Sequence, residues 1–499
     1  MANEIVSLRA GTLAVVKEDI QNLPKRPTAG TEFTATQPDL ALSPGQETLE
    51  NEELKNAIMN GKPIIGRETP TFTMSHYYRS GDISTGSSIK PDYSALLEAA
   101  TGLVHEVPEG SEQAITAVTD ARTFEVADAT GYAKGSMLLV QAATGSELRP
   151  IASINGNEIT LGFDLENVPN IGALIGAPVC YEPLDDSNLI PTLSLWYYLQ
   201  DTIQMESGVR IEGVDLSFPA AELINASFTG SGTGFYFDPL VIDATNDQVT
   251  IEVSATPYTG SIPQGTYKDP HQLAEALTIV MNNLGTGETF TVEYDDAGKY
   301  VATGSNNFGI DGTIANNVWL TAGFDAVLTS EATSHTSVND IDLTSGLTPI
   351  YDSSDPISAK GNVCLIGSPE DNICVQASNV DVSYANTKAD LLSICPESGI
   401  YTSLFNGRTM TATVTSYLTP FEAKYFRDMR TGDTTSFFYG AGEKLGGFFL
   451  KQKCAGAYMS HATITSLEIE DNEGAAMLTI ELSAFAPSDS TQSGFFSFV

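Results

Sequence analysis

The chain has 499 residues and carries 63 Asp and Glu against 24 Lys and Arg, a formal net charge of −39. This balance argues against a nucleic-acid-binding surface, because phosphate contacts need clustered Lys and Arg. The same excess keeps a protein soluble, so solubility and a surface that must not hold DNA are both open interpretations. No apolar run approaches the roughly 18 residues of a membrane span, and Met1–Ile5 has no export signal, so we expect no membrane association.

Composition predicts a mainly β protein without catalytic chemistry. The 43 Gly and 24 Pro are spread among short apolar runs rich in Ser and Thr, which is typical of strands joined by many turns. The five cysteines form no CxxC pair, and the five histidines have no partners at metal-ligand spacing. His76 and His461 are expected at strand surfaces. We therefore expect no enzyme activity, no catalytic residues, no cofactor and no metal.

Residues 1–105 are predicted to begin a first core. Pro, Gly and Thr spacing near the N-terminus indicates strands joined by a long arm, with one or two helical turns at Glu50–Met59. A strand is predicted at Phe72–Tyr77, followed by a helix with Asp92 as its N-cap and Gly102 as its stop.

Residues 106–186 are predicted to form an inserted, small all-β module of the barrel or sandwich type. Its strands are expected at 123–126, 137–141, 148–154 and 158–161, with a tight hairpin turn at Asn155–Asn157. The first core then resumes over 187–237.

A second inserted module, of α+β type, is predicted at 238–345. Its helix has Asp269 as N-cap, Pro270 at the first helical position and Gly285 as the stop. An apolar stripe along this helix is expected to face a core, and it consists of Leu273, Leu277, Val280, Met281 and Leu284.

Residues 346–499 are predicted to form a second core. A strand ending at Tyr417 precedes a helix with Thr419 as N-cap, Glu422 three residues later and Gly432 as the stop. A further strand is expected at Thr434–Tyr439.

Two hairpins share one irregularity, and this predicts an internal duplication. The first is Val209–Phe218 with Leu223–Thr229, and the second is Ala462–Asp471 with Met477–Ala484. In each, the apolar alternation slips by one residue at the same point, as a β-bulge causes. The slips lie between Ile211 and Val214 and between Ile464 and Leu467. Strand, helix, strand and hairpin recur in the same order, so the two cores are predicted to be copies.

The polar residues of these hairpins alternate with the apolar ones and should face away from the core. In the second hairpin they are Glu468, Glu470 and Glu481, and in the first they are Arg210, Glu212 and Asp215. An ordinary wet sheet face and a wall shared between subunits both fit this pattern.

Several segments resemble the major tail tube proteins of long-tailed, siphovirus-like bacteriophages. They are Glu47–Leu54, Lys62–Glu68, Tyr77–Gly81, Pro91–Gly102 and Ser194–Leu199. The resemblance returns in the strand, helix and hairpin of the C-terminal copy. The wider fold family also includes tube-like proteins of contractile machines.

The resemblance implies two β-sandwich cores, each with a flanking helix, whose sheets join those of neighbouring subunits around a DNA channel. It implies a structural virion protein of the tail, made in the host cytoplasm, that binds its own copies and other tail proteins while DNA passes through. Glu212, Asp215, Glu468, Glu470 and Glu481 would then line the channel.

Family members with one core are expected to form rings of six. A chain with two cores would therefore form homotrimeric rings with pseudo-six-fold symmetry, and homohexameric rings with one core in the wall are the alternative. A receptor- or glycan-binding tail component, with the inserted β modules as binding parts, is the alternative function.

Overall fold

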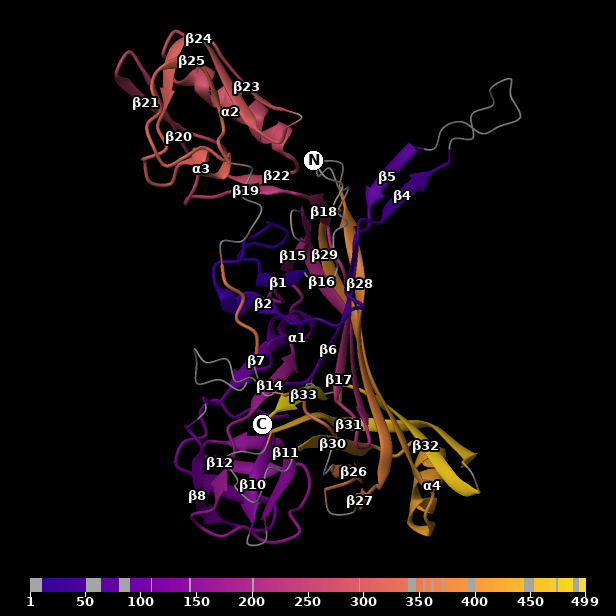
Figure 1. Ribbon diagram of the computed structural model, residues 1–499. Helices are drawn as coiled ribbons and strands as arrows, with labels where there is room; N and C mark the ends of the chain where they lie inside the picture. The colour runs from indigo at the N-terminus through magenta and orange to yellow at the C-terminus, as the bar shows by residue number, and fades with distance from the viewer. Residues whose placement is uncertain are drawn as a thin grey trace, which may run out of the picture.

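The computed structural model describes residues 11–50, 64–79, 90–108, 110–142, 145–199, 202–295, 297–339, 347–352, 355–359, 363–369, 372–393, 400–443, 453–472, 474–487 and 493–499. The protein is mainly β, as predicted, and an 18-stranded network of antiparallel strands organises it. Figure 1 shows the long strands of this network running down the molecule. The helical turns expected at Glu50–Met59 fall, apart from the first residue, outside the described residues.

One continuous sheet of eight strands runs through both predicted cores. Its order is β3–β6–β17–β16–β28–β29–β32–β31. The first four strands are β3 (Ala41–Ser43), β6 (Thr71–Tyr77), β17 (Asn225–Ser231) and β16 (Thr202–Pro219). The last four are β28 (Ala377–Leu392), β29 (Ile400–Tyr417), β32 (Ala475–Ala484) and β31 (Lys453–Asn472). Each predicted core therefore supplies one four-stranded unit, and β16 meets β28 where the units join.

Strands β16 and β31 each pass from this sheet into a second layer. The N-terminal half of β16 pairs with β15 (Leu193–Leu199) and β18 (Gly234–Phe237). The N-terminal half of β31 pairs in the same way with β30 (Thr435–Glu443) and β33 (Gly494–Phe498). The change of layer lies at Val209–Arg210 of β16 and at Ala462 of β31, where the pairings with β15 and β30 each shift register. Such an irregularity bends a strand and increases its twist.

Both predicted bulges are confirmed. The pairing of β16 with β17 shifts between Ile211 and Gly213, and the pairing of β31 with β32 shifts between Ile464 and Ser466. The extra residues are therefore Glu212 and Thr465, at equivalent points of the two hairpins.

The remaining strands of the network extend the second layer and its rim. They are β1 (Thr12–Lys17), β2 (Phe33–Thr34), β7 (Gly102–Glu106), β14 (Val179–Pro183), β26 (Val363–Gly367) and β27 (Asn372–Cys374). A separate ribbon of β4 (Gln46–Leu49) and β5 (Ile64–Glu68) projects from the upper right of the molecule in Figure 1. A short 3-10 turn, η2 (Gly30–Glu32), precedes β2.

Each unit has one helix on the apolar side of its sheet. In α1 (Ser94–Thr101) the buried side chains include Leu96, Leu97 and Ala100, and the helix stops at Gly102 with a φ of 113°, as predicted. The N-cap prediction was wrong, because Asp92 lies one residue before the N-cap Tyr93 and accepts from the ring of His76 at 2.9 Å. His76 is accordingly buried and not at a strand surface.

The second helix, α4 (Ala423–Thr431), follows a 3-10 turn, η3 (Pro420–Glu422). The N-cap prediction was wrong for α4, because its N-cap is Glu422 and Thr419 lies before the 3-10 turn. The backbone N–H of Thr419 still donates to the Glu422 carboxylate, which is one half of the predicted capping box. Gly432 ends the helix with a left-handed φ of 67°, as predicted. Tyr425 is buried on its inner face.

A single hydrophobic core joins the two units. It includes Phe72, Val214 and Phe228 of the first unit and Val414, Ile480 and Leu482 of the second. Phe218 of β16 packs against Tyr439 of β30, with ring centroids 4.9 Å apart. The two copies are therefore packed together as one body.

The first inserted module is a closed barrel. Its strands are β8 (Gln113–Val118), β9 (Thr123–Val126), β10 (Met137–Ala142), β11 (Gly145–Asn155), β12 (Glu158–Leu161) and β13 (Leu174–Ile175). Gly156, with a φ of 62°, makes the predicted hairpin turn between β11 and β12. The next strand, β14, pairs with β7 and β33 of the main network. The predicted bounds of this module, residues 106–186, stay a prediction.

The second inserted module has its own core around α2 (Pro270–Asn283). Asp269 caps this helix by accepting from the Gln272 N–H, and Leu273, Leu277 and Met281 are buried, as predicted. A five-stranded sheet holds β20 (Gln248–Val253), β21 (Thr256–Ser261), β23 (Phe290–Tyr294), β24 (Tyr300–Ile310) and β25 (Ala332–Thr336). The strands β19 (Leu240–Ile242) and β22 (Gly265–Tyr267) pair separately, and α3 (Val318–Thr321) completes the module.

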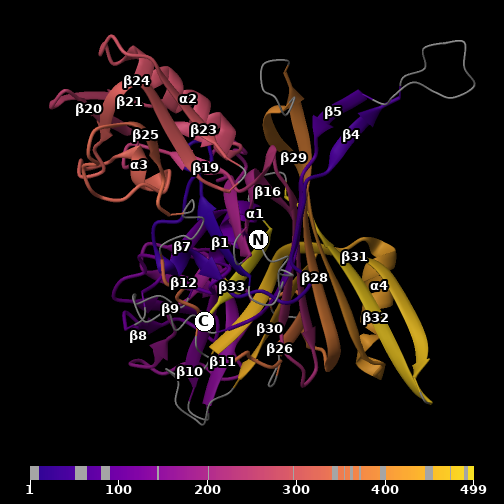
Figure 2. The ribbon, with the colours of Figure 1, turned by 45° about the horizontal axis from the view of Figure 1, so that its top comes forward.

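Both inserted modules lie to the left of the long strands β28 and β29 in Figures 1 and 2, while the β31–β32 hairpin lies to their right. No helix among the described residues is long and apolar enough to cross a membrane.

Candidate functional site: a polar sheet face with two open edges

The eight-stranded sheet presents a continuous polar face opposite its apolar core. Residues that are paired across the sheet share a face, so each row of partners can be followed from strand to strand. One row runs Gly213–Thr229–Thr73–Ala41 in the first unit, and the equivalent row runs Ser466–Glu481–Thr413–Asp381 in the second. The polar face is dominated by Thr, Ser and acidic residues.

We call the following residues the polar face: Ala41, Ser43, Thr71, Thr73, Ser75, Gly213, Asp215, Ser217, Asn225, Ser227, Thr229, Asp381, Ser383, Ala385, Thr409, Thr411, Thr413, Thr415, Ser466, Glu468, Glu470, Thr479, Glu481 and Ser483. No Lys or Arg is among these residues. Two cations lie at the margin of this face. Arg210 pairs with Ser231 in the row of Thr71 and Ser43 and is buried, and the Lys388 ammonium lies 2.6 Å from the Ser231 hydroxyl with a side chain only 9% exposed.

Four of the predicted wall residues lie on this face with exposed side chains: Asp215, Glu468, Glu470 and Glu481. Glu212 is different, because it is the extra residue of the bulge. It is half-buried, accepts from the Ser231 hydroxyl, and has an oxygen 3.8 Å from the Lys388 ammonium. Whether these residues line a channel stays a prediction.

Arg210 was expected to face outward with Glu212 and Asp215, and this prediction was wrong. Its side chain is buried, donates to the Ser187 carbonyl at 3.3 Å and lies over the ring of Phe405. Burial lowers the pKa of its guanidinium to about 10. Its backbone is in the expected phase, because Arg210 pairs with Ser231 in the row of Thr71 and Ser43. The side chain is buried because Phe405 and Ser187, from distant parts of the chain, lie against it.

The sheet ends in two strand edges that no described residue covers. On β31, residues 466–472 pair with β32 along one edge, and no described residue pairs with the other. On β3, residues 41–43 pair with β6 and their outer edge is equally open among the described residues. An open edge presents unpaired N–H and C=O groups and is a template for another strand.

Inside the chain, the β16 edge that corresponds to the open β31 edge is covered by β28. The register places Asp215 opposite Ser383, Leu216 opposite Val382 and Ser217 opposite Asp381. The Ser217 hydroxyl donates to the Asp381 carboxylate at 2.6 Å. We call this pairing of β16 with β28 the internal junction.

A buried amide fastens the internal junction. The side-chain nitrogen of Asn386 on β28 donates to the carbonyl of Ile211 at 3.0 Å and to the carbonyl of Ala100 at 2.9 Å. One side chain therefore ties β28 to the bulge of β16 and to the end of α1. Sequence reasoning missed Asn386, because its place opposite this carbonyl depends on the register of β28 on β16.

Two buried carboxyl groups stand close to the same strands. Glu18 accepts hydrogen bonds from Thr192, Ser194, Gly208 and Asn22, yet its burial raises its pKa. Glu206 on β16 is fully buried, and burial raises its pKa to about 8. When the two copies are aligned at their bulges, Glu206 of β16 corresponds to Met459 of β31.

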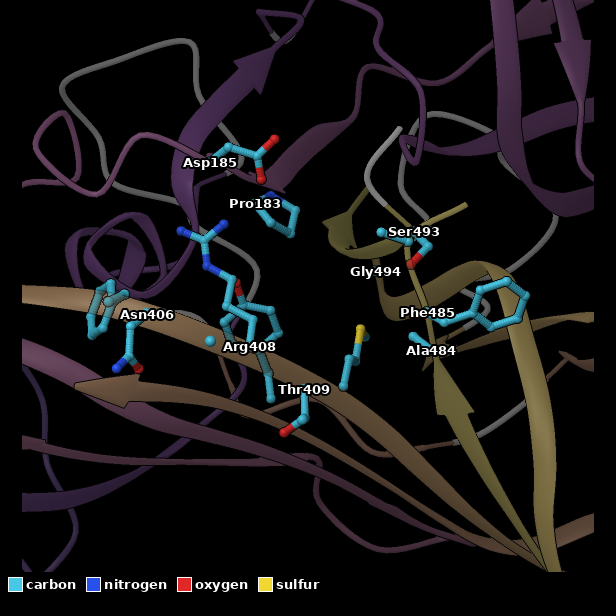
Figure 3. Close-up of a pocket in the computed structure, with 14 residues that line it drawn as sticks. Pro183, Asp185, Asn406, Arg408, Thr409, Ala484, Phe485, Ser493 and Gly494 are labelled. Carbon is cyan, nitrogen blue, oxygen red and sulfur yellow. The ribbon is translucent and has the colours of Figure 1, made fainter. Parts of the chain in front are cut away.

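The pocket in Figure 3 does not combine groups for catalysis. It has a volume of about 400 Å³ and lies between β29 and the ends of β14, β32 and β33. Arg408 extends toward the side of the pocket where Asp185 and Pro183 lie (Figure 3). No nucleophile paired with a base lines it, and the described residues contain no group of three or more metal-ligating side chains.

No protein-family model and no curated protein sequence matches the chain. Among solved structures, a chain in the virion of a native gene transfer agent particle is similar at 12% identity, covering 26% of this chain and 94% of that one with a TM-score of 0.19. A chain of the 6-fold symmetrised anti-feeding prophage baseplate matches at 12% identity, covering 29% and 96% with a TM-score of 0.22. The SPP1 tail tube matches at 14% identity, covering 28% and 78% with a TM-score of 0.19. TM-scores this low carry no weight for function.

Proposed function

We propose that this protein is a structural component of a virion tail, a tube subunit whose rings stack to form the channel that conducts DNA. The observation that carries the proposal is the tandem sheet: two equivalent four-stranded units, one junction inside the chain, and one open edge at each end. A sheet with two complementary ends closes when copies join head to tail in a ring.

Three chains form one ring in this proposal. Their sheets would make a barrel of about 24 strands, and strands about 4.8 Å apart, tilted by about 40°, give a backbone diameter of roughly 40–50 Å. This diameter exceeds that of a DNA duplex even after side chains are added. Six chains per ring, with one unit of each chain in the wall, is the alternative.

The polar face lines the channel in this proposal, with Asp215, Glu468, Glu470 and Glu481 at the surface and Glu212 beside the bulge. Supporting this orientation, the opposite face is buried under α1 and α4. The exposed charged side chains of this wall are acidic, while Lys388 is ion-paired with Glu212 and Asp390 and Arg210 is buried. Such a wall offers DNA phosphates few cations to bind, which lets the duplex slide. Rings would contact one another and further tail proteins at their two ends.

Electron microscopy of the purified protein tests the proposal. We expect hollow rings or tubes with three chains per layer and a pseudo-six-fold wall. Six chains per layer would contradict the trimer while leaving the tube. A monodisperse monomer at high concentration, with no rings under any assembly condition, would contradict the tube itself.

A further inference from the structure

The internal junction is a template for the contact between chains. It joins the last strand of one four-stranded unit to the first strand of the next unit. The two open edges belong to β31, which is the last strand of the second unit, and to β3, which is the first strand of the first unit. In a ring they are therefore the edges that face each other, and the partner of each is a second copy of this chain.

The equivalence of the two units is fixed residue by residue. The bulges align Gly213 with Ser466, and the rows of paired residues then align Ala41 with Asp381. The alignment extends along β4, because Gln46 pairs with Glu68 as Asn386 pairs with Arg408. Gln46 is therefore the counterpart of Asn386.

We propose that β31 of one chain pairs antiparallel with β3 of the next chain in the register of the internal junction. Glu468 then lies opposite Ser43, Ile469 opposite Leu42, and Glu470 opposite Ala41. The carboxamide of Gln46 occupies the place of Asn386 and donates to the carbonyl of Ile464 in the neighbouring chain. This inference rests on the proposed ring.

The side chains brought together by this register are compatible. Ile469 and Leu42 form an apolar pair on the core side, where Leu216 and Val382 meet in the internal junction. Glu468 and Glu470 face Ser43 and Ala41, so no two carboxylates stand opposite each other. Pro44 follows β3 and has no N–H to donate, which limits the ladder on that side to residues up to Ser43.

Exposure shows that the edge of β31 lacks its cover. Leu216 is 1% exposed beneath the junction, whereas its counterpart Ile469 is 54% exposed. Gln46 is also exposed, whereas Asn386 is buried. Ile469 and Gln46 are therefore accessible in the single chain, whereas their counterparts at the internal junction, Leu216 and Asn386, are buried.

Disulfide trapping tests the register. In a background with Cys374→Ser and Cys395→Ser, we would make two double variants with matched cysteines, Ser43→Cys with Glu468→Cys and Ala41→Cys with Glu470→Cys. The control, Ser43→Cys with Glu470→Cys, is offset by two residues, which places its Cβ atoms about 7–8 Å apart, beyond disulfide reach. Assembled particles would be oxidised and analysed by non-reducing electrophoresis and microscopy.

We expect interchain crosslinks in most chains of both matched variants and at least tenfold fewer in the offset control. Rings without crosslinks in the matched variants would overturn this contact and leave the proposed function standing. Crosslinking of the offset pair in place of the matched pairs would overturn the register. Crosslinks to a different protein in purified virions would replace the second copy as partner. Absence of rings altogether would overturn the proposed function.

Gln46→Ala provides an independent readout. We expect the monomer to keep its melting temperature and the concentration needed for ring assembly to rise at least threefold, with Gln46→Asn restoring assembly in part. Unchanged assembly of Gln46→Ala would remove the amide from the proposed contact.

Discussion

The internal junction and the open edge of β31 have the same build and opposite surroundings. Both strands carry a bulge at the same point, followed by alternating apolar and polar residues. At the junction the apolar residues Val214, Leu216 and Phe218 are buried, whereas Ile469 of the open edge is more than half exposed. Both sequences carry the pattern of a half-buried strand, so the burial of the apolar side chains of β16 depends on the neighbouring strand β28, which the open edge of β31 lacks among the described residues.

The largest expected effect comes from placing a charge at the two equivalent positions. Leu216→Asp buries a carboxylate in the core and should destabilise the chain by at least about 4 kcal/mol. Ile469→Asp should change the free energy of unfolding by less than about 1 kcal/mol while preventing ring assembly. Chemical denaturation and sedimentation velocity measure both. Equal destabilisation by the two substitutions would show that the edge of β31 is already packed in the monomer.

A second difference between the copies is the buried carboxyl of Glu206, where the second copy has Met459. The folded-state pKa of Glu206 is about 8, above the ordinary value of 4.5, so the folded chain binds a proton that the unfolded chain has lost. Its contribution to stability is fully present below pH 4.5 and is lost as the pH rises to about 8.

Glu206→Met should therefore flatten this pH dependence and stabilise the chain at pH 8 by about 2–4 kcal/mol relative to the parent, with less gain at pH 5. Thermal unfolding of both proteins between pH 5 and pH 8 measures the effect. Glu18, whose pKa is also raised, remains in both proteins and so cancels in the comparison. A constant difference across this pH range would contradict a protonated Glu206 in the fold.

The amide pair gives an effect of intermediate size. Asn386→Ala removes the donor from two buried carbonyls, those of Ile211 and Ala100, and should cost about 2 kcal/mol in the monomer. The exposed Gln46→Ala should cost less than about 0.5 kcal/mol in the monomer. Urea unfolding of the two variants measures the contrast, and a similar loss in both would mean that Gln46 already has a structural partner within its own chain.

The smallest effect on stability is expected on the polar face. Glu468→Lys combined with Glu470→Lys should shift the free energy of unfolding by less than about 0.5 kcal/mol, because both side chains are exposed. Tubes should still form, and DNA ejection should slow because Lys binds phosphate. Single-particle ejection assays measure the rate, with Glu468→Gln and Glu470→Gln as the control for loss of charge alone. Unchanged ejection from the Lys variant would place these residues outside the channel.

The sequence alone predicted the local features that depend on few residues. The two bulges, the stops of α1 and α4 at glycine and the cap of α2 by Asp269 follow from alternation and from backbone preferences within a few positions. Asp92 and His76 were misplaced because their partners are each other, and only the tertiary fold brings the segment before α1 against β6. Arg210 was misplaced because Phe405 and Ser187, which bury it, are brought against it only by the tertiary fold.

What the sequence determined by itself is the repeated pattern: two hairpins with the same bulge, each preceded by a strand and a helix, and an acidic chain without a basic cluster. The tertiary structure decided that these copies join edge to edge through β16 and β28, that Asn386 is buried at this junction, and that Glu206 is buried where β16 pairs with β15 and β18. Pairing between β16 and β28 links residues more than 150 positions apart in the chain. Backbone hydrogen bonds along an edge carry no side-chain signature, so only the folded arrangement shows which edges are filled and which remain open.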